Sequence, residues 1–133
     1  MSTLKVATIQ DTSGNNSSTP EQVAQGRAKA WVNFEADGTV AIIDDFNVSS
    51  ITDGGTAIFT VNFTNALPNA NYTMTGSSHT FSTDYTGIVV SLSARGGSGN
   101  SIDTKTTTAC KIVTAASTTE VDPVNISVLF FAS

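Results

Sequence analysis

Apolar and polar residues alternate along most of residues 27–133, which is the pattern of strands that face a core on one side. In "KAWVNFEA", Val32 and Phe34 share one face, while Trp31 and Asn33 share the other. Two later segments repeat the pattern, with faces formed by Phe59, Val61 and Phe63 in "TAIFTVNF" and by Val124, Ile126, Val128 and Phe130 in "PVNISVLFFA". The alternation predicts a β-rich domain.

Turn signals separate these segments from five further strand-like ones, "TVAIID", "FNVSSI", "YTMTGSS", "GIVVSLSA" and "DTKTTTACKIVTA". "DG" at 37–38 predicts a hairpin turn. Ser and Thr occupy 37 of the 133 positions and charged residues only 13%, a composition that suits strands better than helices. With seven to nine strands, the sequence predicts an all-β domain over 27–133, an antiparallel, jelly-roll-like β-sandwich.

Residues 1–26 have a different pattern, and we expect them to form an extended N-terminal arm. Leu4 and Val6 alternate with polar residues in "LKVATIQ", and Ile9 breaks the phase. The polar run "DTSGNNSSTPEQ" follows and offers nothing to a core, so it is expected to be a flexible joint. The chain thus divides into an N-terminal arm, 1–26, and a β-sandwich domain, 27–133.

The end of this arm carries the signals of a very short helix. In "TPEQVAQG", Thr19 is the expected N-cap, Pro20 takes the first helical position, Gln22 completes a capping box and Gly26 ends the helix. Trp31, the only tryptophan, follows on the first expected strand. We expect Trp31 either to close the end of the domain or to pack against the arm.

Charge and hydropathy exclude two classes of partner. Six basic residues against eleven acidic ones give a net charge of −5, and Arg27 with Lys29 is the densest basic pair. Nucleic acid is therefore not expected as a partner, because phosphate binding needs concentrated positive charge. No apolar run approaches the roughly 20 residues that span a bilayer, and no signal peptide is evident. We expect a soluble protein, made without export and not inserted in a membrane.

Carboxylates offer one candidate site. Asp44, Asp45 and Asp53 are the densest acidic group, for which a catalytic pair or a calcium site is conceivable. The D-x-D spacing of a calcium loop is absent, and the three residues coincide with expected turns, so turn chemistry is the favoured interpretation.

The other chemistry-bearing residues favour structural roles. His79 lies with Ser78 and Asp84 in one polar segment, whereas a catalytic triad needs groups from separate elements. The lone Cys110 is expected to be a small buried hydrophobe. We therefore expect no enzyme, no metal and no cofactor.

Two loops are candidates for contact with another molecule. Phe81 and Tyr85 are aromatic residues in a polar segment, where exposed rings make good binding anchors, although a core position for both rings is the slightly favoured interpretation. The loop "GGSGN" ends at Asn100 and lacks the lysine and following helix of a phosphate-binding loop. We expect it to be flexible.

Two stretches resemble a known family. "LKVATIQDTSGN" at 4–15 resembles a motif near the start of many tailed-bacteriophage fibre and virion proteins. Residues 25–78, through "GRAKAWVNF", "FNVSSITD" and "TVNFTNALPNANY", are similar to a domain that recurs in phage tail-fibre proteins. The two stretches cover about half of the chain, and residues 79–133 match only in their β pattern.

This resemblance implies a non-enzymatic virion component, assembled in the host cytoplasm and attached by its arm to another tail, baseplate or capsid protein. It also implies that the protein is a homotrimer. The class of virion protein that it favours is a short tail or baseplate fibre or adhesin. Leu4, Val6 and Ile9 would then anchor the arm by adding a strand to a partner's sheet. Pro20, Gly26 and Trp31 would mark the junction between arm and domain.

On this interpretation, loops with His79, Phe81, Tyr85 and Asn100 would contact the host surface, with glycan as the expected ligand. Two alternatives stay open. A capsid decoration protein fits the length of the chain equally well. A polysaccharide-degrading enzyme would need a carboxylate pair roughly 5–10 Å apart, for which the Asp44, Asp45 and Asp53 group is the one candidate.

Overall fold

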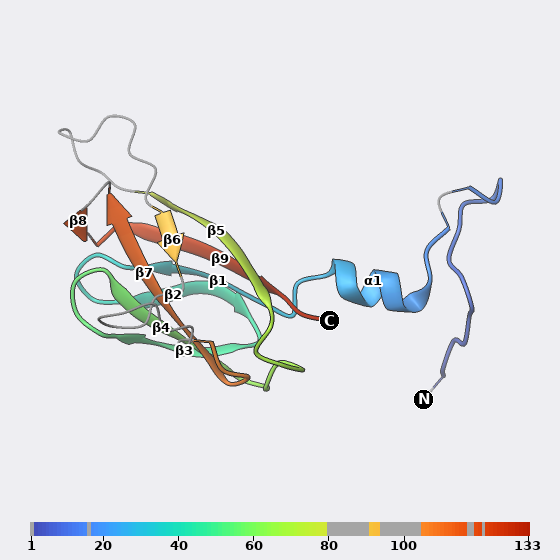
Figure 1. The fold of residues 1–133 in the computed structure, drawn as a ribbon, viewed down its shortest axis with the longest axis horizontal. Helices are drawn as coiled ribbons and strands as arrows, with labels where there is room; N and C mark the ends of the chain where they lie inside the picture. Colours follow the sequence, from blue (N-terminus) through green and yellow to red (C-terminus); the bar gives the residue numbers. More distant parts are fainter. Residues whose placement is uncertain (1, 16, 80–90, 94–104, 117–118, 121) are drawn as a thin grey trace.

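A computed structural model describes residues 2–15, 17–79, 91–93, 105–116, 119–120 and 122–133. These residues form mostly strands, in two antiparallel sheets, with one short helix (Figure 1). The elements are α1 (Pro20–Gly26), β1 (Ala30–Glu35), β2 (Ala41–Phe46), β3 (Val48–Asp53), β4 (Ile58–Phe63), β5 (Thr73–His79), β6 (Ser91–Ser93), β7 (Ala109–Ala116), β8 (Thr119–Glu120) and β9 (Asn125–Phe131). The predicted all-β class is confirmed.

The first sheet has the strand order β2-β1-β9-β5, and the second has β3-β4-β7-β6 with β8 beside β7. Strand β1 lies between β2 and β9, so that Trp31 is paired with Phe46 on one side and with Leu129 on the other. Hairpins β1–β2, β3–β4 and β6–β7 each stay within one sheet. The finer prediction of a jelly-roll-like arrangement is therefore not confirmed by this strand order.

Side chains from both sheets meet in one core. Phe34 of β1 contacts Phe59 of β4 edge to face, with ring centroids 5.5 Å apart. Phe63, Tyr72 and Phe130 form a second aromatic group, with centroids 5.0 to 5.9 Å apart. The expected alternation is confirmed in β1, β4 and β9, where the residues on the predicted inner faces are buried, except for the half-buried Val124 just before β9.

Two local predictions differ from the structure. Asp44 and Asp45 lie within strand β2 and not in a turn. The strand expected over 103–115 begins only at Ala109, because the Thr106 hydroxyl accepts a hydrogen bond from the Ala109 backbone N–H at 2.9 Å and closes a tight turn before it. Thr side chains often compete with strand pairing in this way.

Asn47 connects three parts of the fold at the β2–β3 crossing. Its backbone has a φ of 58°, and its side-chain amide donates to the backbone carbonyls of Lys29 and Asn65, both at 3.1 Å. Its Oδ1 accepts from the Asn65 backbone N–H at 2.8 Å. One side chain thus links the entry to β1, the crossing between the sheets and the loop after β4.

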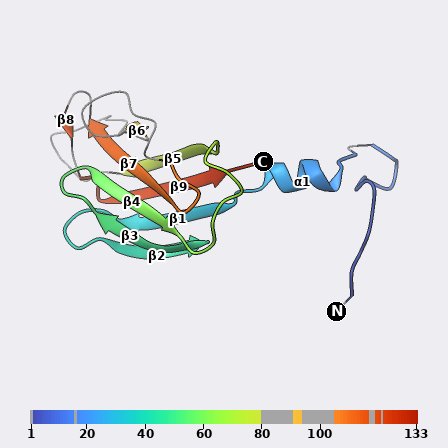
Figure 2. The same ribbon diagram turned by 60° about the horizontal axis from the view of Figure 1, so that its bottom comes forward.

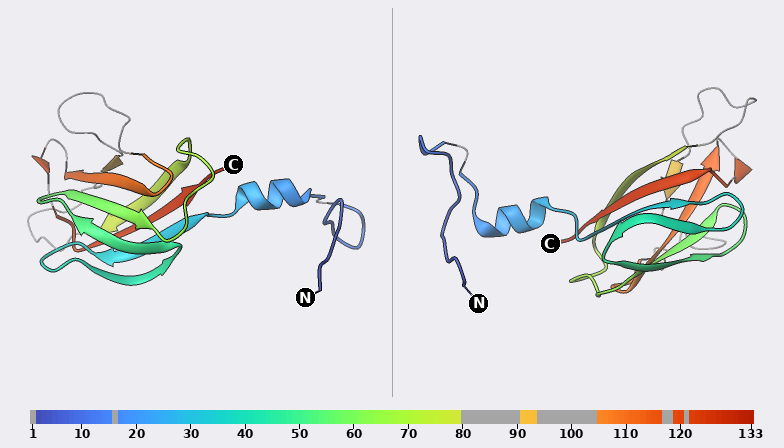
Figure 3. Two further views of the ribbon diagram at one scale, coloured as in Figure 1. Left: turned by 90° about the horizontal axis from the view of Figure 1, so that it is seen from below. Right: turned by 180° about the vertical axis from the view of Figure 1, so that it is seen from behind.

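Residues 2–29, which we call the N-terminal segment, precede the two sheets. Figures 1 to 3 show α1 and the residues before it extending from the end of the sheets at which the chain's C-terminus also lies. Next to the sheets, the Lys29 N–H donates to the Phe130 carbonyl at 2.7 Å, and the Lys29 Nζ donates to the Ala24 carbonyl at 2.6 Å. Lys29 therefore connects the last turn of α1 to the start of β1.

The predicted helix is confirmed, including its capping box. Thr19 accepts from the Gln22 backbone N–H at 3.2 Å, and the Gln22 side chain accepts from the Thr19 N–H at 2.8 Å. The helix ends differently from the expectation, since Gly26 is its last residue with an ordinary φ and the extended backbone of Arg27 terminates it.

The polar run before α1 was expected to be a flexible joint, and it forms a closed turn. Ile9 and Ser18 exchange two backbone hydrogen bonds of 2.8 Å. Inside the turn, the Asp11 carboxylate accepts from the backbone N–H groups of Ser13 and Asn15, at 2.9 and 2.8 Å. An aspartate at the start of a polar run commonly stabilises a turn by such bonds.

Candidate functional site

An apolar row crosses the outer face of the first sheet. The strand register places Phe46, Trp31 and Leu129 side by side on β2, β1 and β9, on the face opposite the core. Phe46 is 53% exposed and Leu129 36%, while Trp31 is half-buried. Phe131, also half-buried, lies two residues further along β9 on the same face. We call these four residues the tryptophan face.

The next row along the strands is polar. Asn33 is paired with Asp44 of β2 and with Ser127 of β9, and Ser127 is in turn paired with Ser77 of β5. The Ser127 hydroxyl donates to Asn33 Oδ1 at 3.2 Å. The outer face thus changes from apolar to hydrogen-bonding within one row, or two residues along each strand.

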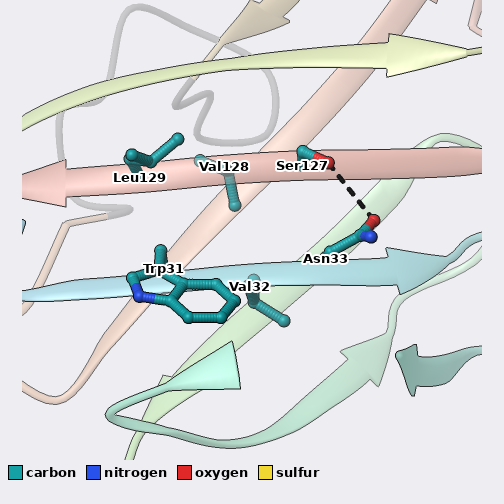
Figure 4. A pocket seen from close by; sticks show the side chains of 6 residues that line it. All are labelled: Trp31, Val32, Asn33, Ser127, Val128 and Leu129. Atoms are coloured by element: carbon teal, nitrogen blue, oxygen red, sulfur yellow. Dashed lines mark hydrogen bonds between the residues drawn. The ribbon is translucent and has the colours of Figure 1, made fainter. Parts of the chain in front are cut away.

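A shallow pocket of about 320 Å³ lies between β1 and β9 at this boundary. Its lining residues are Trp31, Val32, Asn33, Ser127, Val128 and Leu129. Figure 4 shows the Trp31 ring lying along β1 on one side of the pocket, and the Asn33–Ser127 hydrogen bond closing the other. Such a surface can bind an apolar group beside a hydrogen-bonding partner.

The acidic residues predicted as a candidate site have separate local roles. Asp53 accepts from the Gly55 N–H at 2.8 Å, which is the expected turn chemistry. Asp44 accepts from the Asp45 N–H at 2.9 Å inside β2, and Asp45 accepts from the Val48 N–H at 3.4 Å. Within the part of the chain that the structure describes, no group of three metal-binding side chains converges.

Cys110 is fully buried in β7, as expected. Burial raises the pKa of its thiol, against smaller opposing effects of a hydrogen bond with Tyr72 and the charge of Lys105. Burial also raises the pKa of the Tyr72 hydroxyl, which donates to the Ala109 carbonyl at 3.1 Å. Lys105 Nζ donates to the Tyr72 carbonyl at 3.0 Å and lies 5.4 Å from the ring centroid. This group holds the start of β7 against the core.

The remaining predicted site residues do not gather in one place. His79 is the exposed last residue of β5, paired with Asn125, and so belongs to a strand rather than to a loop tip. Phe81, Tyr85 and Asn100, as well as Asp84, lie outside the described residues. The predicted contact loops therefore stay predictions.

In the N-terminal segment, Leu4 is 86% exposed, Val6 42% and Ile9 52%. Pro20 and Gly26 are the exposed first and last residues of α1, and Trp31 is the second residue of β1. The three apolar residues contribute nothing to the core. Exposed apolar side chains often mark a binding site for another molecule. These three residues are the second such feature of the protein, beside the tryptophan face.

Sequence reasoning did not identify Phe46, Leu129 and Ser127 as site residues. One signal was available, because the positions of "VLFF" that alternate with the buried Val128 and Phe130 are also apolar. An outward face that is apolar in two strands indicates a contact surface. The proximity of Phe46 to Trp31 and Leu129 could be recognised only from the strand register of the structure.

Comparisons of this chain with protein-family models, with curated proteins and with solved structures gave no match. Among the described residues, no helix is long and apolar enough to cross a membrane.

Proposed function

We propose that this protein is a non-enzymatic structural component of a tailed-bacteriophage virion, a short tail or baseplate fibre or adhesin. Residues 1–26 form its attachment arm, and residues 27–133 form a β-sandwich that is displayed outward. The single observation that carries the proposal is the exposure of Leu4, Val6 and Ile9, three apolar residues within the first nine that cover no part of the core. The family resemblance of residues 4–15 and 25–78 supports it.

The physical chemistry of the arm favours docking onto another protein. An extended segment can add to the edge of a partner's sheet, where backbone hydrogen bonds supply affinity and alternate side chains fill pockets. Leu4 and Val6 have the two-residue spacing that such pairing needs, because alternate residues of a strand point to the same side. Several arms presented by one homotrimer would bind together more strongly than one arm alone.

The proposal predicts that the arm's apolar side chains are required for incorporation into the virion. A variant with Leu4→Asp, Val6→Asp and Ile9→Asp should fold normally but fall at least about tenfold in copies per particle, because three apolar contacts are lost. Quantitative mass spectrometry of purified particles measures this number. The matched control is Thr3→Asp, Thr8→Asp and Gln10→Asp, which adds the same charge at exposed polar positions of the same segment.

Incorporation of the apolar variant at the native level would refute the arm as the attachment device. Gold labelling of the β-sandwich in electron micrographs then separates the two virion roles. Label on the tail supports the fibre or adhesin, whereas label over the capsid supports the alternative, a decoration protein. Host-surface glycan is the proposed ligand of the displayed domain, and no cofactor is needed in either role.

A further inference from the structure

We infer that the tryptophan face is the contact between copies of this chain, in a cyclic homo-oligomer where the β2 edge of one copy packs against the β9–β5 side of the next. The inference rests on the proposed function for the copy number, three, and adds the surface that holds the copies together.

The rows of the outer face match each other when copies are arranged around an axis along the strands. Each row then keeps its level, so that Phe46 at the β2 edge of one copy meets Leu129 and the paired Thr75 of the next. Two residues further along, Asp44 meets Ser127 and Ser77, whose hydroxyl groups are suitable donors to a carboxylate. The apolar Phe46 thus faces Leu129 beside the methyl-bearing Thr75, and the Asp44 acceptor faces hydroxyl donors.

The negative charge on β2 disfavours the simpler arrangement, in which the β2 edges of two copies contact each other. That contact would bring Asp44 and Asp45 of both copies together, in a chain that already carries a net charge of −5, and like charges across an interface are costly. The described outward positions of β5, namely Thr73, Thr75, Ser77 and His79, are exposed, and none of them carries a carboxylate. The acidic edge therefore fits the β5 side of a neighbour, and head-to-tail contacts of this kind form a ring when the rotation between copies closes.

The exposure of helix α1 also favours a second copy of this chain as the partner. It has seven residues and buries none of them, and a helix of this length is marginal without tertiary support. Val23 is 46% exposed on α1. Helix α1 leaves the end of the sheets (Figure 1), and Trp31 is the second residue of β1, a few residues after α1. A cyclic arrangement would therefore bring the α1 helices of neighbouring copies close to the axis. Neighbouring copies would then cover Val23 and place all arms at one end.

The first test measures the mass of the full chain by light scattering. The native chain should have three times the monomer mass of 13.8 kDa. Phe46→Lys should weaken association at least about 30-fold, since it places a charge in an apolar contact where hot-spot side chains contribute about 2 kcal/mol or more. Because Phe46 is 53% exposed, the variant should keep the native circular dichroism and melting transition. The matched control is Thr52→Lys, which puts the same side chain at an exposed position of β3 in the other sheet.

The second test uses charge at Ser77, which the inference places opposite Asp44 of the neighbour. Ser77→Asp should shift the mass toward the monomer, whereas Ser77→Lys should keep the oligomer, because only the first brings like charges together. Trp31 adds an independent signal, since it is the only tryptophan. Its emission should shift to longer wavelength when dilution dissociates the native chain.

A native chain that stays monomeric, or a Phe46→Lys variant with the native mass, would overturn the inference. A monomer whose Trp31 emission responds to added dextran would also overturn it and assign the face to a sugar. These outcomes are distinguishable from a failure of the proposed function, which is measured on particles with changes at Leu4, Val6 and Ile9. Loss of incorporation in those variants, together with a monomeric native chain, would refute this inference alone.

Discussion

At the scale of single residues, Asn47 carries more of the fold than its position between two strands suggests. Its left-handed backbone places the side chain where it can bond to Lys29 and Asn65, which are 18 residues away in either direction. Asn is enriched at such φ values because its short polar side chain tolerates them. The sequence shows one Asn among many, so this role could not be predicted from composition or pattern.

Replacing Asn47 should therefore destabilise the folded protein. Asn47→Ala should lower the free energy of unfolding by about 2–3 kcal/mol, because it removes hydrogen bonds to backbone groups and places a less tolerant residue at positive φ. Asn47→Gly keeps the backbone conformation and isolates the loss of the side-chain bonds. Urea unfolding measures both, with the exposed Asn71→Ala as a control expected within about 0.5 kcal/mol of the native protein. An equally small effect at Asn47 would contradict the assigned role.

Tyr72 and Cys110 should make the protein sensitive to alkaline pH. Burial raises the pKa of both groups, so the folded state keeps protons that the unfolded state releases above pH of about 8.5 for Cys and 10 for Tyr. Their contribution is fully present below pH of about 8.5. It is lost as the pH rises further, by up to about 1.4 kcal/mol per pH unit for each group.

Melting temperatures between pH 7 and 11 measure this dependence. The decline above pH 10 should be shallower in Tyr72→Phe than in the native protein, although Tyr72→Phe should be less stable at pH 7 because it loses the bond to the Ala109 carbonyl. Parallel curves for the two proteins would show that Tyr72 does not titrate differently on folding.

At the scale of elements, alternation was a sufficient guide where one face of a strand is buried. It identified the inner faces of β1, β4 and β9, and the capping signals identified α1 with its first residue. It was insufficient for β7, where the turn around Thr106 replaces the first part of the expected strand. Which strands are neighbours could not be predicted, because pairing of β1 with β9 depends on contacts almost 100 residues apart. The tryptophan face depends on that pairing.

The β3–β4 hairpin depends on one glycine conformation. Gly55 has a φ of +100°, where any residue with a Cβ is strained. Gly55→Ala should lower the free energy of unfolding by about 1–2 kcal/mol. Gly26→Ala is the matched control, because Gly26 has an ordinary φ and open space around its Cα, and it should be neutral or slightly stabilising. Equal effects at the two positions in urea unfolding would contradict this explanation.

At the scale of the whole molecule, two groups of exposed apolar residues lie apart from each other, in addition to the single exposed Ile43 of β2. One group lies in the N-terminal segment, at Leu4, Val6 and Ile9, and the other is the tryptophan face of the first sheet. We propose different occupants for the two, a virion partner for the segment and a second copy for the face. On this proposal the two contacts would not compete, because they use separate residues.

The pairing of β1 with β9 also determines how the protein responds to mechanical force. Ala30 and Phe130 are partners at one end of this ladder, next to the Lys29–Phe130 hydrogen bond. Tension applied across residues 29 and 131 would open the ladder like a zip, one bond at a time, which is the direction of least resistance. Tension applied through the N-terminal segment and the opposite end of the sheets would instead load many bonds in shear. Attachment through the N-terminal segment, with the load at the opposite end of the sheets, is thus an arrangement in which the β1–β9 ladder resists force better than when it is pulled at residues 29 and 131.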